Sequence, residues 1–178
     1  MAFTSTVFIG TSLDGFIARE NDDITWLTSR GSDLGTDMGF GEFMAGVDTV
    51  VMGRSTYEVV VGFGEEVWPY GDRHIAVVST TLPEDVDPRV TVYRDLDAVV
   101  ADLEARGAKH AYIDGGRLIQ SFLRAGRVDR LIVNTAPVLI GTGHSLFGPL
   151  DRDVGLAHEW TKTHPGGFVQ TSWAVVRD

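Results

Sequence analysis

The chain has 178 residues, the length of one ordinary globular domain, and its 43% hydrophobic and 22% charged residues can bury a core. We therefore expect one domain over residues 1–178 and exclude a disordered chain. The formal net charge of -10 argues against a nucleic-acid partner, because a phosphate backbone would be repelled. The absence of cysteine excludes disulfides, thiol nucleophiles and thiolate metal sites.

The sequence also argues against a membrane protein. No stretch approaches the roughly 18 consecutive apolar residues that a spanning helix needs. The first ten residues, MAFTSTVFIG, lack the basic segment that begins a signal peptide. We expect a cytoplasmic protein.

Short apolar runs alternate with helical patterns along the chain. Strands are predicted at residues 3–10, 48–53, 74–79, 90–93, 110–114 and 128–140, and Pro137 is expected to bend or end the last of these. Helices are predicted at residues 55–63, 95–106 and 116–125. Ser55 is expected to be the N-cap of the first helix, with Glu58 as its capping-box partner. Gly107 and Gly126 are expected to end the other two.

This alternation predicts an α/β fold with a mostly parallel central sheet and helices on both of its faces. Residues 154–164 and 167–177 read as two further strands joined at HPGG (164–167). We expect them to form an antiparallel hairpin at one edge of the sheet. Ligands in such sheets bind outside the carboxyl ends of the strands.

Three strand-to-helix junctions carry similar residues: VMGRST (51–56), VVSTT (77–81) and IDGGR (113–117). Backbone N–H groups at a helix start attract phosphate, glycine permits close approach, and arginine and hydroxyl groups add donors. Together the junctions suit a dinucleotide with more than one phosphate group, although a turn or a cap would explain any one of them alone. No G-x-G-x-x-G follows the first strand and no P-loop occurs, which argues against the commonest nucleotide sites.

The chain resembles the dihydrofolate reductase fold, and within it the branch related to the reductase domain of bacterial riboflavin-biosynthesis enzymes. The resemblance runs from about residue 5 to residue 176. It is carried by SLDGFIA (12–18), Trp26, VVMGRSTYE (50–58), VVSTT (77–81), IDGGRLIQSFL (113–123) and APVLIGTGHSLF (136–147).

The resemblance implies NADPH as cofactor and assigns residues to it. The G-R-x-T turn of that family binds phosphates of NADPH, and it falls on Gly53, Arg54, Ser55 and Thr56. The hydroxyl run after the next strand receives the adenosine 2′-phosphate together with that arginine, and it falls on Ser79, Thr80 and Thr81. The Gly-Gly turn and the helix start cradle the pyrophosphate, and they fall on Gly115, Gly116, Arg117, Leu118 and Ile119.

Two acids are candidates for the reacting end. Folate-reducing members carry a carboxylate sixteen residues before the glycine of G-R-x-T, which here is Asp37. Asp37 is thus either the group that supports substrate protonation or a helix cap, because Gly39 and Gly41 weaken the helix expected around it. Asp14 in SLDG is the second candidate, since this branch keeps an Asp-Gly at the mobile loop beside the nicotinamide; a plain turn is the alternative.

Trp26 and Tyr57 have positions that suggest the wall of a substrate pocket, whereas the other aromatic residues read as core. The five histidines do not cluster at ligand spacing, so no metal site is expected. The absence of cysteine also excludes the zinc deaminase to which such reductases are usually fused.

We therefore expect an NADPH-dependent reductase of a small heterocyclic or carbonyl substrate, acting by hydride transfer from the nicotinamide. The alternative is a non-catalytic nucleotide-binding or sensor protein that keeps the cofactor cleft. A homodimer is also expected. Members of the branch commonly pair, and the last strands carry apolar residues that a lone edge would expose, namely Val169, Trp173, Val175 and Val176.

Overall fold

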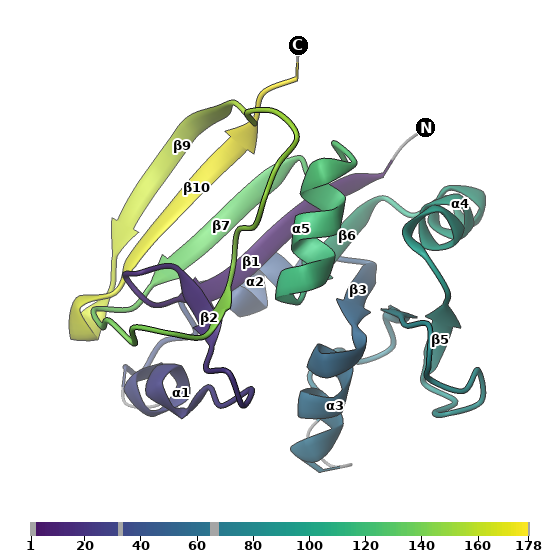
Figure 1. The fold of residues 1–178 in the computed structure, drawn as a ribbon, viewed down its shortest axis with the longest axis horizontal. Helices are drawn as coiled ribbons and strands as arrows, with labels where there is room; N and C mark the ends of the chain where they lie inside the picture. Colours follow the sequence, from purple (N-terminus) through teal and green to yellow (C-terminus); the bar gives the residue numbers. More distant parts are fainter. Residues whose placement is uncertain (1–2, 32–33, 65–67, 178) are drawn as a thin grey trace.

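The computed structural model describes residues 3–31, 34–64 and 68–177. The main strands are β1 (Thr4–Thr11), β3 (Thr49–Gly53), β4 (His74–Val78), β5 (Val90–Tyr93), β6 (His110–Asp114), β7 (Arg130–Thr135), β9 (Leu156–Thr163) and β10 (Val169–Val175). They form one eight-stranded sheet in the order β5-β4-β3-β6-β1-β7-β10-β9 (Figure 1). The strands from β5 to β7 are parallel, and β10 and β9 follow as an antiparallel hairpin. The predicted fold class is confirmed.

Helices cover both faces of the sheet. They are α1 (Thr25–Gly31), α2 (Phe40–Ala45), α3 (Arg54–Gly62), α4 (Leu96–Arg106) and α5 (Gly116–Arg124). The apolar stripes of α4 and α5, including Leu103 and Phe122, pack on one face of the sheet. Met44 of α2 and Tyr57 of α3 pack on the other face. In Figure 1, α5 lies in front of the sheet and α2 behind it.

The helix caps that the sequence predicts agree with the structure for α4 but not for α3. Asp95 caps α4 by accepting a hydrogen bond from the Ala98 N–H at 2.8 Å, and Gly107 ends the helix with φ of 69°. The expected cap of α3 is wrong: Gly53 is its N-cap, no side chain caps it, and Ser55 lies inside the first turn. Glu58 instead accepts from Nε of Arg54 at 2.7 Å, one turn away.

Several short elements differ from the prediction. β7 ends at Thr135, so Pro137 lies outside the strand rather than bending it. Helix α1 was not expected, and α2 is a short form of the helix expected around Asp37, beginning only after it. The small sheet of β2 (Phe16–Ala18) and β8 (His144–Ser145) was not expected either. The hairpin turn is as predicted, with Gly166 at φ of 73° inside it.

The parallel strands all end at the same edge of the sheet, which is the lower edge in Figure 1. The opposite edge holds both ends of the described chain, and Phe3 and Arg177 line one small pocket there. None of the helices in the described residues is long and apolar enough to cross a lipid bilayer.

Candidate functional site

The three candidate junctions lie side by side, because β4, β3 and β6 are neighbours and parallel. The first and third touch. A Cβ atom added at Gly115 would lie 2.6 Å from Oγ1 of Thr56 and 3.6 Å from the backbone N of Gly53. Gly115 also has φ of 99°, which favours glycine. The junction between β6 and α5 thus requires glycine at position 115, and it lies directly against the start of α3.

Arg54 and Thr81 are 27 positions apart in the chain, and the fold brings them together. Nη1 of Arg54 donates to Oγ1 of Thr81 at 2.9 Å, and Glu58 holds the same guanidinium from the other side. Arg54 and Thr81 are both exposed, as is Thr80. This corner offers a positive charge and hydroxyl groups to solvent.

Ser79 differs from its two hydroxyl neighbours because it is buried. Its Oγ accepts hydrogen bonds from the N–H groups of Thr81 and Leu82 at 3.2 and 3.1 Å. The Ser79 hydroxyl therefore stabilises the turn that presents Thr80 and Thr81.

Arg94 is a second cation at this corner, and the sequence interpretation missed it. Its Nη1 donates to the carbonyl oxygens of Ser79 at 3.0 Å and Leu82 at 2.7 Å. The sequence signal that could have placed Arg94 here is its position directly after β5. Because β5 pairs in parallel with β4, the carboxyl ends of both strands lie at the same edge of the sheet.

The start of α5 presents free backbone donors. Its first internal hydrogen bond runs from the Ile119 N–H to the Gly115 carbonyl at 2.9 Å. The N–H groups of Gly116, Arg117 and Leu118 precede that bond, so they have no acceptor within the helix. Leu118 and Ile119 bury their side chains in the core, whereas Arg117 is exposed and forms no side-chain hydrogen bond or ion pair within the described part of the chain.

Gly116 has a second role, in packing. A Cβ atom at this position would lie 2.6 Å from Cδ1 of Ile17 on β2 and 3.5 Å from the carbonyl oxygen of Ser145 on β8. Gln120 of α5 also donates to that carbonyl, at 3.0 Å. The small sheet therefore packs directly on the start of α5.

The two predicted acids are exposed and hydrogen-bonded to backbone N–H groups. Asp37 accepts from Gly41 at 2.7 Å and Gly39 at 2.9 Å, and these bonds hold its pKa below the ordinary value. Gly39 and not Asp37 is the N-cap of α2, so Asp37 is neither the N-cap nor a residue of the first turn. From two positions before the cap, its carboxylate still accepts the N–H of Gly41 in the first turn. The carboxylate is ionised at neutral pH.

Asp14 ties two loops together. It accepts from the N–H groups of Gly141 at 2.8 Å and Ile140 at 3.2 Å, which connects SLDG to the glycine loop before β8. A hydrogen bond from Ser12, followed by these backbone bonds, holds the pKa of Asp14 below its ordinary value.

Asp114 is a third carboxylate, to which the sequence interpretation gave no role. It is the last residue of β6, directly before Gly115, and it is mostly buried. Burial raises its pKa from 3.8 to about 6, although hydrogen bonds from Tyr112 and the Gly115 N–H oppose the rise. Asp114 is thus a carboxyl group at this edge whose pKa is raised toward neutral pH. The sequence signal that could have identified Asp114 is its position directly before the Gly-Gly junction in IDGG (113–116).

Trp26 and Tyr57 are both buried, at 4% and 5% exposure. Trp26 packs against Ala136 and Phe168, while the Tyr57 hydroxyl donates to Asp87 at 3.3 Å. Among the described residues, no group of three or more His, Asp or Glu side chains could hold a metal ion.

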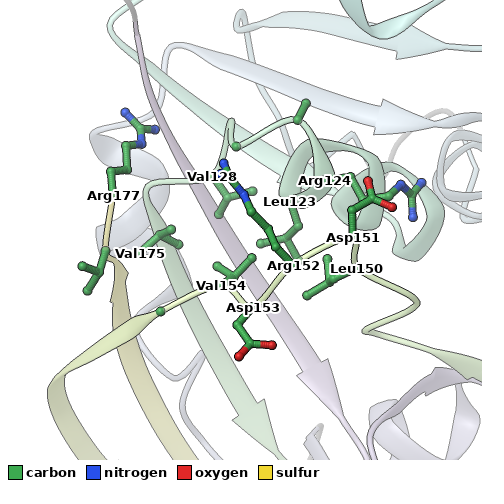
Figure 2. A pocket seen from close by; sticks show the side chains of 14 residues that line it. Leu123, Arg124, Val128, Leu150, Asp151, Arg152, Asp153, Val154, Val175 and Arg177 are labelled. Atoms are coloured by element: carbon green, nitrogen blue, oxygen red, sulfur yellow. The ribbon is translucent and has the colours of Figure 1, made fainter.

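A groove of about 570 Å³ lies at the opposite edge of the molecule and contains none of these candidates (Figure 2). It runs between the end of α5, the segment before β9 and the end of β10, and its lining includes Leu123, Arg152 and Val175.

Comparisons with known proteins agree with this fold. Residues 4–167 match the family model described as the RibD C-terminal domain. A putative riboflavin biosynthesis protein from Shewanella sp. PV-4 is 35% identical with a TM-score of 0.88, over 99% of this chain and 100% of that chain. The uncharacterized protein YwjB of Bacillus subtilis is 33% identical over 160 residues, 89% of this chain and 90% of its own length.

A more distant structure shares the fold alone. It is the diaminohydroxyphosphoribosylaminopyrimidine deaminase/5-amino-6-(5-phosphoribosylamino)uracil reductase of Thermotoga maritima, which is 12% identical with a TM-score of 0.72. The match covers 98% of this chain and 57% of that longer chain.

Proposed function

Because the chain belongs to the RibD C-terminal domain family, we propose that it is an NADPH-dependent reductase of a small heterocyclic or carbonyl substrate. The bound nicotinamide would supply the hydride. The observation that carries the proposal is the contact between junctions: the Arg54–Thr81 pair and the Gly115 turn lie on neighbouring strand ends.

The donors present fit the phosphates of NADPH. Arg54, Thr80 and Thr81, with Arg94 beside them, form the subsite for the 2′-phosphate, and Ser79 holds their turn. Gly53, Ser55 and Thr56 at the start of α3 and Gly115 to Ile119 at the start of α5 form the subsite for the pyrophosphate, where the free N–H groups of the first helical turn donate. A cofactor without the 2′-phosphate would leave the cationic corner unused, so NADPH is preferred to NADH.

Asp114 is the proposed proton donor, because a carboxyl group with a pKa of about 6 can both hold and release a proton near neutral pH. Asp37 and Asp14 remain candidates from the sequence for this role. Their hydrogen bonds support a different contribution, which is to fix the loops around the site. Trp26 and Tyr57 stay assigned to the wall of the substrate pocket.

A cofactor titration tests the proposal. Replacing Arg54 with alanine removes a charge-assisted contact worth about 1.5–3 kcal/mol, which corresponds to a ten- to a hundredfold weaker binding of NADPH. The affinity for NADH should barely change. Arg124→Ala is the matched control, because Arg124 is an exposed arginine at the far end of α5. An equal loss for both cofactors would contradict the 2′-phosphate assignment.

Turnover distinguishes the enzyme from the alternative, a binding or sensor protein. NADPH oxidation is followed with dihydrofolate, with pyrimidines and with ketones. Oxidation with any of them supports the reductase. Micromolar NADPH binding without turnover on the whole panel supports the binding protein.

We also propose that the protein is a cytoplasmic homodimer. β10 is not the edge of the sheet, because β9 covers it. β9 is the edge strand on this side of the sheet, and seven of its eight residues are exposed. A second copy that pairs with this strand would satisfy its free backbone groups.

A further inference from the structure

We propose that Asn134 is a substrate-specificity residue, whose buried side-chain oxygen accepts a hydrogen bond from an N–H group of the substrate. This inference rests on the proposed function, and it narrows the substrate to one that carries such a donor. A simple ketone has no N–H group to offer.

The first observation is an unpartnered acceptor. Asn134 is 4% exposed, and its Oδ1 has no hydrogen-bond partner among the described residues. Its Nδ2 reaches the carbonyl oxygen of Ile9 at 3.4 Å, which orients the amide and leaves Oδ1 free. A buried acceptor without a partner destabilises a protein, so a ligand or a water molecule has to satisfy it.

The second observation is an unpartnered donor nearby. Trp26 is also 4% exposed, and its Nε1 lacks a partner within the described ranges. Trp26 packs on Ala136, which follows Asn134 by two positions. A ligand that carries both an N–H donor and a carbonyl acceptor would satisfy both groups.

The third observation is the position of Asn134 relative to Asp114. Asn134 points to the same face of the sheet as Ile132, and Asp114 to the same face as Tyr112, and Ile132 and Tyr112 share one core cluster. Only β1 lies between β6 and β7. Strand spacing and register put the two residues roughly 12 Å apart.

The strand between them carries a glycine beside Asn134, and a leucine from α1 covers it. Gly10 of β1 pairs with Asn134 and carries no side chain. Leu27 of α1 fills the position above it, with Cδ2 2.6 Å from where a Cβ atom would lie. A heterocyclic ring resting against Leu27 would have Asp114 on one side and Asn134 on the other.

Gln170 is a matched control, because it pairs with Asn134 on the neighbouring strand β10 and is 2% exposed. Unlike Asn134, it uses both ends of its amide. Nε2 donates to the Met38 carbonyl oxygen at 2.8 Å, and Oε1 lies 3.0 Å from Nε2 of His164. Asn134→Leu and Gln170→Leu therefore remove two neighbouring amides, of which only one has a free acceptor.

The test uses two probes that differ in their N–H groups, uracil and 1,3-dimethyluracil. Calorimetry measures their binding to the protein saturated with NADP⁺. Wild type should bind uracil at least about tenfold more tightly than the dimethyl compound. Asn134→Leu should lose this preference through weaker uracil binding, with wild-type thermal stability and NADPH affinity. Gln170→Leu should keep the preference and melt at a lower temperature.

Three results would overturn the inference: no binding of either probe to wild type, equal binding of both, or a preference that survives in Asn134→Leu. The last result would mean that the methyl groups are rejected by their size and that water satisfies Asn134. If wild type does not bind NADP⁺ at all, that result contradicts the proposed function instead. Failure of the inference about Asn134 and failure of the proposed function are therefore distinguishable.

Discussion

Replacing Asp114 with asparagine should stabilise the folded protein, and increasingly so as the pH rises. Burial raises the pKa of this carboxyl group in the folded state from 3.8 to about 6. The folded protein therefore binds the proton more tightly than the unfolded chain does. Between these two values, each rise in pH makes the folded state lose stability, and above about 6 the loss is complete. Asparagine carries no charge, so the variant escapes this loss.

The size of the effect follows from the shift. At about 1.36 kcal/mol per pKa unit, a rise from 3.8 to about 6 corresponds to about 3 kcal/mol. Asp114 keeps some contact with solvent, which reduces the cost, so we expect a gain of about 1–3 kcal/mol.

Urea denaturation of the cofactor-free protein at pH 4 and at pH 8 measures this gain. The difference in unfolding free energy between variant and wild type should grow by that amount from the lower to the higher pH. Any packing effect of the amide is the same at both values and cancels. Asp37→Asn is the control: its pKa is lowered by the Gly41 and Gly39 N–H groups, so its difference from wild type should not grow with pH in this direction.

Activity gives a second measurement of the same variant. If Asp114 supplies the proton, Asp114→Asn should bind NADPH and lose turnover, and wild-type turnover should fall as the pH rises above about 6. A stability difference independent of pH would refute the raised pKa. A fully active variant would refute the role in proton transfer.

Three further results are expected. Gly116→Val should melt at a lower temperature, because the new side chain would collide with Ile17. Adding Ile17→Ala should restore the melting temperature. If the double variant still binds NADPH more weakly than wild type in a titration, the difference reports on the pyrophosphate subsite. Asp37→Asn should keep wild-type turnover in a steady-state NADPH oxidation assay, since the amide oxygen of asparagine can still accept a backbone hydrogen bond at the start of α2. Turnover that is lost but recovered at low pH would return the catalytic role to Asp37. Light scattering should give about twice the 19.4 kDa mass of the chain, and a monomer at micromolar concentration would remove the homodimer proposal.

The sheet and the three junctions could be predicted because their signals are local. Buried parallel strands are continuous apolar runs, and Gly115 and Gly53 mark the places where they end. The contact between Arg54 and Thr81 needed only the expectation that neighbouring strands end at the same edge.

The unpredicted or only partly predicted parts depend on distant residues. Helix α2 has six residues, starts after a glycine and contains Gly41, so its own sequence hardly favours a helix. It is stabilised by Phe43, which stacks on Phe8 of β1 at 5.1 Å between ring centroids. The raised pKa of Asp114 likewise comes from burial by several elements, which no spacing in the sequence reveals.

Phe3 and Arg177 line the same small pocket, at the edge opposite the strand ends that carry the candidate site. A tag or a surface linker at either terminus would therefore extend away from the three junctions, so an immobilised protein would present the candidate site to solution. The closeness of the two ends also makes the chain suitable for circular permutation, because a short linker can join them. New ends opened in the exposed turn at Pro165–Gly167 would separate β9 from β10 in sequence while leaving every junction residue in its original order.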